Sequence, residues 1–280
     1  MNSNSEINPT ISYIKAKMKR GKIVSAEDAV RVIRDGDTVA LDGFVGCCIP
    51  EELIIGLEKR FLSTGEPRNL TIVYASGLGD GKDQGANRLA HEGLLKRVIA
   101  GHWGLTPKLQ SLALDGKIEA YNLPQGVLTH LFRDIAAHNP RTISRVGLGT
   151  FADPRCGGGK INSITTEDLV EVIQFDGHDY LAYKTYPIQI AILRGTTADM
   201  DGNVTMEKEP VTLEVLPVAM AVKNSGGFVI VQVERIAERG ALNARQVKIP
   251  GILVDCVVVA KPENHRQTYV TQYNAAYSCE

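Results

Sequence analysis

The sequence predicts an α/β protein with an open, largely parallel sheet flanked by helices. Patterns typical of helices alternate along the chain with short apolar runs typical of strands, and such alternation favours parallel strands joined by helices. Phe228–Val233 and Ile252–Ala260 are strongly apolar runs, as expected of strands buried on both faces. The chain has 280 residues and no internal repeat or low-complexity linker, so one compact domain is the simplest interpretation.

The first predicted elements lie near the N-terminus. Residues 1–20 are expected to be a flexible extension, and the folded domain is expected to occupy residues 21–270. Ser25 is the expected N-cap of a first helix, with Asp28 three residues later in the manner of a capping box. That helix is expected to end at Asp35–Gly36.

A strand, a helix and a second strand follow. Thr38–Leu41 is short and β-rich. Pro50 is expected to begin a helix at its first position, and Gly65 to end it as a C-cap. Leu70–Ala75 is the next predicted strand.

The rest of the chain continues the alternation. The further predicted elements are helices at His91–Ala100 and Gly126–Ala137 and a strand at Glu119–Leu123. Ile188–Arg194 and Asn203–Glu207 are predicted to pair as a hairpin across the turn Asp199–Gly202.

The composition is that of an ordinary globular protein. Hydrophobic residues make up 44% and charged residues 22%, and the formal net charge is -1. So small a net charge argues against nucleic acid or an anionic membrane as a partner. No apolar stretch reaches the roughly 18 residues of a membrane span, and the start of the chain lacks the apolar core of a signal peptide. We therefore expect a cytoplasmic protein.

The cysteines do not follow a metal-binding or disulfide pattern. No C-x-x-C pair occurs, and no histidine or cysteine stands at the short spacing of a zinc site. We expect reduced thiols and no bound metal. A catalytic role for Cys47 or Cys48 stays open. The cysteines are Cys47, Cys48, Cys156, Cys256 and Cys279.

The segment Asp42–Pro50, DGFVGCCIP, is the first candidate site. It lies between a predicted strand and a predicted helix, and ligands of open α/β sheets bind at the carboxyl ends of strands. Glycine lets the backbone approach a ligand closely, and a helix start presents free N–H groups to negative charge. Val45 and Gly46 are therefore candidate N–H donors to an oxyanion. A plain structural turn is the alternative interpretation.

Two glycine-rich loops resemble nucleotide-binding motifs but lack required residues. Cys156–Lys160 ends in Gly-Lys, yet Pro154 and Ile161 stand where a P-loop needs Gly and Ser or Thr. A backbone anion site and a simple turn remain its two interpretations. Gly77–Gly85 follows a strand, but Lys82 stands where the dinucleotide-binding pattern needs glycine.

Two turns complete the candidates. Asp199–Asn203 begins like a calcium-binding loop, but Val204 and Pro210 replace the required Gly and Glu. It is predicted to be a hairpin turn. Pro124–Gly126 lies between a strand and a helix, and the amide of Gln125 is able to donate to a substrate carboxylate. A structural turn is the alternative there.

The run Asp35–Pro50 resembles the N-terminal signature of family I coenzyme A transferases. That signature reads Asp-Gly, two residues, three apolar residues, Gly-Gly-Phe, three residues, Gly-x-Pro. The sequence departs from it at Asp42 and Cys48, where glycine is usual. The positions that agree are Asp35, Gly36, Val39, Ala40, Leu41, Gly43, Phe44 and Pro50.

Further segments match the family in the same order along the chain. They are His91–Pro107, Glu119–His138, Gly149–Asn162, Arg194–Thr205 and Val229–Ile236. Together they resemble the α-type, N-terminal half of the branch that includes propionate CoA-transferase and related short-chain acyl-CoA:carboxylate transferases. The resemblance covers Gly21 to Lys261.

The resemblance implies transfer of coenzyme A between a carboxylate and a short-chain acyl-CoA, such as propionyl-, acetyl- or acetoacetyl-CoA. In the family a glutamate attacks the thioester to form an acyl–glutamyl anhydride, and the CoA thiolate then returns to give a glutamyl–CoA thioester. Coenzyme A is thus a substrate, and no metal or redox cofactor is implied. Family members carry the glutamate in a second, β-type half, and no segment of this chain matches its motif.

The resemblance therefore implies one half of a larger oligomeric enzyme. Residues 271–280 are expected to lie near the junction to a β-type half that is the partner. Val45 and Gly46 are expected to contribute to the oxyanion site. The expected substrate-binding residues are Gly43, Phe44, Gln125 and Gly126. A non-catalytic half acting only as a binding or assembly module is the alternative, and an isomerase resembling ribose-phosphate isomerase is a third possibility.

Overall fold

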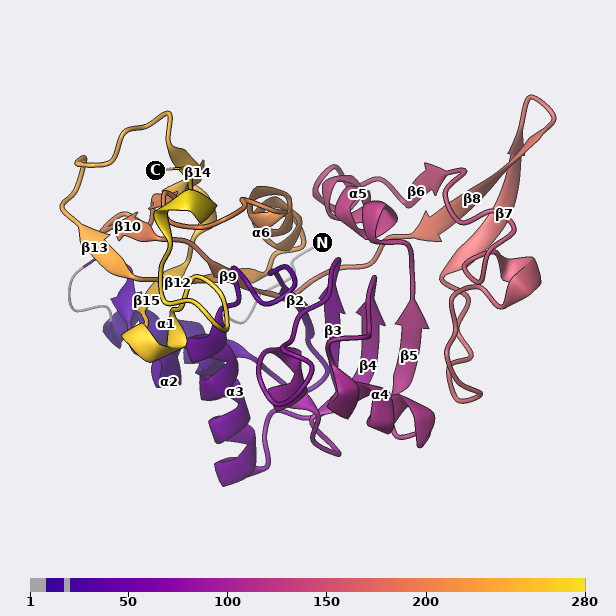
Figure 1. Ribbon diagram of the computed structural model, residues 1–280, viewed down its shortest axis with the longest axis horizontal. Helices are drawn as coiled ribbons and strands as arrows, with labels where there is room; N and C mark the ends of the chain where they lie inside the picture. Colours follow the sequence, from indigo (N-terminus) through magenta and orange to yellow (C-terminus); the bar gives the residue numbers. More distant parts are fainter. Residues whose placement is uncertain (1–8, 18–20, 280) are drawn as a thin grey trace, which may run out of the picture.

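A computed structural model describes residues 9–17 and 21–279. Its central sheet has eight strands, all parallel, in the order β1-β15-β12-β9-β2-β3-β4-β5 (Figure 1). This confirms the predicted open parallel sheet. The strands are β1 (Ile23–Val24), β2 (Thr38–Leu41), β3 (Leu70–Tyr74), β4 (Leu95–Ala100), β5 (Glu119–Asn122), β9 (Ile190–Arg194), β12 (Phe228–Val233) and β15 (Cys256–Val259).

Both faces of the central sheet are buried. Successive strand residues point to opposite faces, so Val39 and Leu41 of β2 join the core on one side and Ala40 joins the core on the other. A sheet covered on both sides needs apolar residues at almost every position. This explains the continuous apolar runs of β9, β12 and β15.

Helices cover the two faces unequally. One face packs against α1 (Pro9–Lys17), α2 (Ala26–Ala29), α3 (Glu51–Thr64) and α4 (Pro107–Leu114). The other packs against α5 (Gln125–Ala136) and α6 (Val215–Asn224), which also contact each other (Figure 1). In α5 the apolar residues recur at helical spacing, as in Val127, Leu128 and Leu131. Burying each such leucine contributes about 1.5–3 kcal/mol.

Two small sheets extend the domain beyond the central one. An antiparallel sheet of β6 (Arg141–Ser144), β8 (His178–Lys184) and β7 (Val170–Phe175) lies at the right in Figure 1. A sheet of β13 (Arg235–Ala237), β10 (Thr197–Asp199), β11 (Val204–Thr205) and β14 (Val247–Ile249) lies at the left. Short 3-10 turns occur at Val30–Val32, Ala86–Leu89, Pro154–Cys156, Gly251–Leu253, Pro262–Asn264 and Ala275–Tyr277.

The helix ends predicted at Ser25 and Gly65 are confirmed, whereas Pro50 lies one residue before α3, which begins at Glu51. The Ser25 hydroxyl oxygen accepts the N–H of Asp28 at 3.1 Å, as a capping box requires. Gly65 ends α3 with a φ of 75°, and its N–H donates to the carbonyl of Phe61. The first helix stops earlier than expected, at Ala29, and continues only as a 3-10 turn to Val32. The Asp37 carboxylate then accepts the N–H of Arg34 at 2.8 Å in the turn that follows.

The prediction of a helix over His91–Ala100 is wrong. Leu95–Ala100 forms β4, an inner strand of the central sheet that lies between β3 and the edge strand β5. Leu94, Leu95, Val98 and Ile99 are all buried, and their spacing imitates one face of a helix. A strand buried on both faces produces the same pattern.

The predicted hairpin is also incorrect in its first strand. Ile190–Arg194 is β9, a central strand between β2 and β12. β11 instead pairs antiparallel with the short strand β10 on one side and with β14 on the other. Gly195 permits the change of direction, since a Cβ there would lie 2.2 Å from Cγ1 of Val204. The turn at Asp199–Gly202 is confirmed.

Residues 1–20 are predicted to be a flexible extension, but the part of them that the structure describes is helical. Pro9–Lys17 forms α1, and Ile14 is fully buried against the core. The remainder of residues 1–20 lies outside the described residues. Among the helices of residues 9–17 and 21–279, none combines the length and apolar character that crossing a membrane needs.

Candidate active site

The order of the strands reverses between β2 and β9. From β2 the chain proceeds through β3 and β4 to β5 on one side, whereas β9, β12 and β15 follow one another on the other side. Open α/β sheets bind ligands at such a switch point, outside the carboxyl ends of the strands. The segment Asp42–Pro50 leaves β2 at this place, beside the end of β9.

The tip of this segment is a tight turn with an unusual backbone. Phe44 and Cys47 exchange two hydrogen bonds of 2.9 Å each. Between them Val45 has a φ of 45° and Gly46 a φ of 84°, as in the two-residue turns of hairpins. A positive φ is rare for a β-branched residue. Val45 is 57% exposed, so its side chain gains little packing in return for the strained backbone.

The two predicted oxyanion donors differ in this conformation. The N–H of Val45 donates to the carbonyl of Gly77 at 2.9 Å. Within the described residues, no hydrogen bond is made by the N–H of Gly46. Gly46 is buried against Tyr269, and it is thus the one of the two whose N–H has no partner among the described residues.

The start of α3 does not offer free N–H groups, contrary to our expectation. The N–H groups of Glu52 and Leu53 both donate to the side-chain oxygen of Gln232, at 2.9 and 3.3 Å. Gln232 lies on β12 and is fully buried. A residue distant in sequence therefore caps this helix, which leaves the turn before it as the place of the candidate donor.

A C-terminal segment, Pro262–Tyr277 (yellow in Figure 1), covers the turn. The N–H of Tyr269 donates to the carbonyl of Gly46 at 3.0 Å, and Thr268 forms a bridge with Cys47. Burial is the main cause that raises the pKa of Tyr269, and the charge of Glu51 adds to it. No sequence pattern pointed to this contact.

The turn borders a cavity of about 540 Å³. Residues from four segments line it, among them Val45, Gly46, Asp80, Leu105, Tyr269 and Val270. The cavity therefore includes the glycine-rich loop Gly77–Gly85. In that loop Asp80 accepts the N–H groups of Lys82, Asp83 and Gln84 at 2.8–3.0 Å. Burial works against the charged carboxylate, but these bonds outweigh it and lower the pKa of Asp80.

The predicted substrate residues lie in different surroundings. Phe44 is 37% exposed beside the turn, whereas Gly43 is packed so closely that a Cβ would lie 2.5 Å from Ile49 and Leu78. Gln125 and Gly126 are exposed at the start of α5, after β5. Three strand spacings of about 4.8 Å separate β5 from β2. The residues thus share one edge of the sheet without lining one cavity.

Two buried glutamates near the turn have structural partners. The Glu51 carboxylate accepts the N–H of Gly85 at 3.0 Å and pairs with Arg88. The Glu52 carboxylate accepts from Lys261 and Asn264. Neither carboxylate is free to act as a nucleophile in this arrangement.

The two adjacent thiols are also bonded to the backbone. Cys47 donates to the carbonyl of Phe44 at 2.9 Å, and Cys48 lies 3.4 Å from the carbonyl of Val211. When Cys47 is ionised, a hydrogen bond from the Cys48 thiol is the main cause that lowers the pKa of Cys47, and the same interaction raises the pKa of Cys48. Cys48 has a φ of 56°, a conformation that suits the glycine of the family signature.

The remaining motifs are structural turns. In Cys156–Lys160 the N–H groups of Cys156, Gly158 and Gly159 donate to backbone carbonyls, and Lys160 pairs with Asp168. These bonds occupy the groups that an anion would need. In the turn Asp199–Asn203, the Asp199 carboxylate accepts the N–H of Asp201 at 3.0 Å. This confirms the hairpin-turn prediction.

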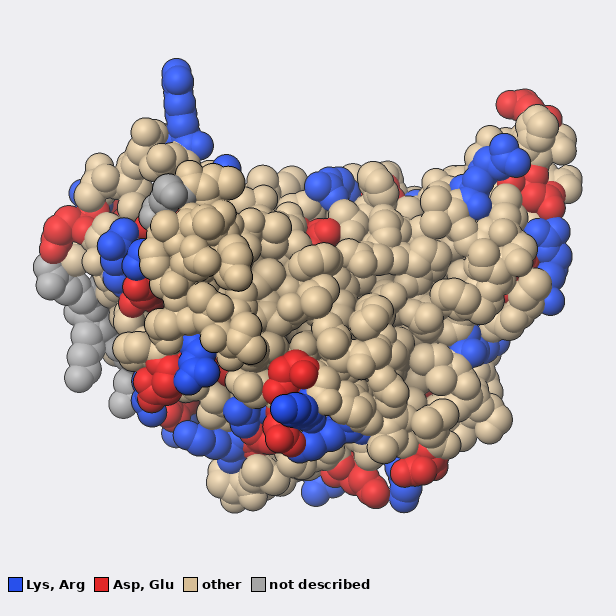
Figure 2. Space-filling model, viewed as in Figure 1, with Lys and Arg blue, Asp and Glu red and all other residues tan. Residues whose placement is uncertain are grey.

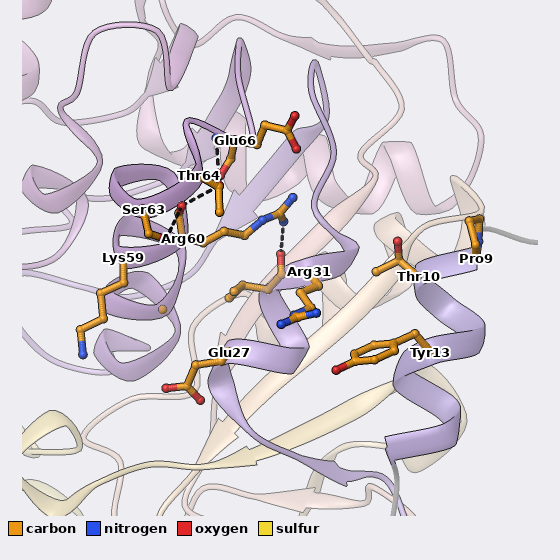
Figure 3. Close-up of a pocket in the computed structure, with 12 residues that line it drawn as sticks. Pro9, Thr10, Tyr13, Glu27, Arg31, Lys59, Arg60, Ser63, Thr64 and Glu66 are labelled. Atoms are coloured by element: carbon orange, nitrogen blue, oxygen red, sulfur yellow. Dashed lines mark hydrogen bonds between the residues drawn. The ribbon is translucent and has the colours of Figure 1, made fainter.

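A larger cavity, of about 680 Å³, lies away from this edge (Figure 3). Tyr13 of α1, Arg31 and Arg60 of α3 are among its lining residues. It borders the C-terminal half of α3, which precedes the start of β3, so this cavity lies at the opposite edge of the sheet from the candidate site. Arg60 donates to the carbonyls of Val30 and Ile33 at 2.6 and 2.8 Å, so its charge fastens η1, the 3-10 turn Val30–Val32, to α3.

Known proteins that are similar to this chain in sequence and in fold include coenzyme A transferases. A family model described as coenzyme A transferase matches residues 23–260. Caffeate CoA-transferase of Acetobacterium woodii is 47% identical over 92% of this chain and 49% of its own length. The crystal structure of the acyl-CoA transferase YdiF from Escherichia coli O157:H7 matches with a TM-score of 0.89 and 44% identity, over 92% of this chain and 50% of that chain.

A third relative differs in length. It is one of the subunits of the succinyl-CoA:3-ketoacid coenzyme A transferase of Xanthomonas campestris, and it is 30% identical over 83% of this chain and 86% of its own length. The chain thus spans about half the length of the first two proteins and nearly the whole of a separate subunit.

Proposed function

This chain belongs to the coenzyme A transferase family, and we propose that it forms one wall of the active site of an enzyme that transfers coenzyme A between a short-chain acyl-CoA and a carboxylate. The observation that carries the proposal is the N–H of Gly46, which has no hydrogen-bond partner within residues 9–17 and 21–279 and lies at the sheet's switch point beside a cavity. Such a donor suits the oxyanion of a tetrahedral intermediate.

A second half would supply the nucleophile. In the mechanism that the resemblance implies, a glutamate attacks the thioester carbonyl, the CoA thiolate leaves, and its later return releases the acyl group as a carboxylate. The incoming carboxylate takes the CoA by the reverse sequence. Glu51 and Glu52, the buried glutamates beside the turn, are held by other groups. The length of the relatives supports a β-type half as the partner.

The surface around the turn supports such a partner. Val45 and Val270 line the same cavity and are 57% and 93% exposed. On the face shown in Figure 2, charged side chains gather at the rim and the two ends and leave the middle largely uncharged. The same cavity is lined by Asp80, Lys82 and Asp83, so its surroundings suit a partner surface that is partly apolar and partly charged. We therefore also propose that the working enzyme is oligomeric.

The test is an assay of the chain alone and of the chain combined with a β-type half. The C-terminal half of the Escherichia coli O157:H7 relative serves as the candidate half, either as a separate chain or joined in line. Transfer from propionyl-CoA or acetyl-CoA to acetate or lactate is measured. We expect activity only in the combination.

Borohydride treatment during turnover then locates the nucleophile, because it reduces a glutamyl–CoA thioester to an alcohol. Peptide mapping is expected to find the modified glutamate in the β-type half. Transfer by the chain alone, with a modified glutamate in it, would contradict the proposed division of the site. No transfer with any partner would favour a role as a binding or assembly module.

A further inference from the structure

A buried ion pair lies directly beneath the candidate site. Arg194, the last residue of β9, pairs with Glu209 through Nε and Oε1 at 3.0 Å. Their side chains are 4% and 1% exposed. Burying two charges is costly unless their geometry is good and the remaining polar atoms are also bonded. The other nitrogens of the guanidinium therefore need partners as well.

Those nitrogens reach two segments that are distant in sequence. Nη1 donates to the carbonyl of Ile49 at 3.2 Å and to that of Arg266 at 2.8 Å. Ile49 belongs to the turn segment that follows β2, and Arg266 to the C-terminal segment that covers this turn. A planar guanidinium with five donors is able to bridge several acceptors in fixed directions.

These contacts hold the turn at two points. Arg194 fixes the carbonyl of Ile49, and three residues after Arg266 the N–H of Tyr269 bonds to Gly46. One guanidinium thus ties β9 to both the turn and its cover.

We propose that Arg194 is a positioning residue, which orients the N–H of Gly46 by joining Ile49 and Arg266 through one guanidinium. The catalytic consequence rests on the function proposed above, whereas the structural consequence does not. Glu209 adds one contact to the guanidinium through Oε1, whereas its Oε2 has no hydrogen-bond partner among the described residues.

The surroundings of the pair explain why Glu209 remains charged. Burial disfavours its carboxylate, but Arg194 and His265 outweigh burial and lower the pKa of Glu209. Burial lowers the pKa of His265, whose Nδ1 lies 3.0 Å from the side-chain nitrogen of Gln232.

Arg194, Glu209 and His265 also line a cavity of about 160 Å³. Lys208 and Glu234, which face the same cavity, bond to each other at 2.9 Å.

The test is Arg194→Lys, followed by hydrogen–deuterium exchange in the chain. Lysine keeps the charge beside Glu209, but a single ammonium group does not reproduce the planar fork. We expect exchange about tenfold faster in peptides covering residues 43–50 and 266–272, with β12 unchanged. In the assembled enzyme we expect kcat to fall about tenfold or more while KM for acyl-CoA stays similar.

Arg235→Lys is the matched control. Arg235 also pairs with a glutamate, Glu207, at 3.0 Å, but its side chain is 58% exposed. We expect no change in exchange at residues 43–50 for this variant. If exchange at residues 43–50 became similarly faster in both variants, the proposal would be overturned. The effect would then not be specific to the buried pair of Arg194 and Glu209.

Other outcomes also decide the proposal. Unchanged exchange in a folded Arg194→Lys chain overturns it, even if activity is lost, because positioning would not be the cause. If Arg194→Lys does not fold, Glu209→Gln keeps the shape of the pair and is expected to speed exchange in the same two peptides. If the unaltered chain shows no transfer with any partner, the proposed function fails, while the exchange data still decide the role of Arg194.

Discussion

The N–H of Tyr269 donates to the carbonyl of Gly46 at 3.0 Å, and a Cβ built on Gly46 would lie 2.9 Å from Cδ2 of the Tyr269 ring. The C-terminal segment is therefore fitted to a turn that carries no side chain at this position. Any side chain placed there would press against the Tyr269 ring.

Gly46→Ala is expected to destabilise the chain more than Gly36→Ala. Both glycines have a positive φ, 84° and 77°, which costs an alanine about 1–2 kcal/mol. A Cβ at Gly36 meets nothing within 4 Å. Overpacking against Tyr269 should cost Gly46→Ala about 1–3 kcal/mol more. Urea unfolding measures the difference, and equal losses would mean that Tyr269 moves aside freely.

Gln232→Met is expected to destabilise the chain strongly. Methionine has a similar shape but leaves the N–H groups of Glu52 and Leu53 without their acceptor. Each buried group left unpaired costs about 1–3 kcal/mol, so a loss of about 3 kcal/mol is expected in urea unfolding. Gln246→Met, at an exposed position, should change stability by about 0.5 kcal/mol at most. Similar effects of the two changes would show that the cap adds little.

Asp42→Asn is expected to stabilise the chain increasingly as pH rises. Burial, followed by the charge of Glu214, raises the pKa of Asp42 well above its usual range. The folded chain therefore binds the proton more tightly than the unfolded chain, whose aspartates have a pKa of about 3.9. The stability that this proton contributes is present below about pH 4 and is lost as pH rises towards the folded pKa.

The measurement is urea unfolding of both proteins across pH. The advantage of Asp42→Asn should grow by up to about 1.4 kcal/mol per pH unit in that window. Asp115→Asn, at an exposed position, controls for the loss of one carboxyl. A difference between Asp42→Asn and the unaltered chain that stays constant with pH would contradict the prediction.

Cys47 is expected to react with iodoacetamide at a lower pH than an ordinary thiol. Its hydrogen bond with Cys48 is the main cause that lowers its pKa, and the thiolate is the reactive form. Cys48→Ala removes that bond, so the midpoint of alkylation against pH should move upwards. Peptide mapping follows Cys47, with the exposed Cys156 as internal reference. An unchanged midpoint in Cys48→Ala would rule out the bond as the cause.

Elements with a local signal could be predicted from the sequence. Ser25 with Asp28, and Gly65 after α3, satisfy backbone groups within a few residues, so the pattern is visible in a short window. The segment Asp42–Pro50 was found for the same reason, since glycines and Pro50 lie between a strand and a helix. Its position at the switch point follows from the sheet order that the structure adds.

Contacts between distant residues could not be predicted in this way. Gln232 looks like one polar residue in an apolar strand, and nothing near it indicates that it caps α3. The bond from Val45 to Gly77 likewise depends on how two loops meet, and it distinguishes Val45 from Gly46. His91–Ala100 shows the opposite difficulty, because its local pattern is compatible with both a helix and a buried strand.

The reversal of strand order at β2 and β9 also governs how the chain assembles during synthesis. The contacts that support the turn span 145 residues from Ile49 to Arg194, 180 from Glu52 to Gln232, and 218 from Glu51 to Tyr269. A growing chain therefore leaves the ribosome with the turn long before its supports exist. Until β9 emerges, β2 is an open edge with unpaired backbone groups, which other chains are able to join. The region proposed to carry the chemistry is thus completed late, after the C-terminal segment has joined it.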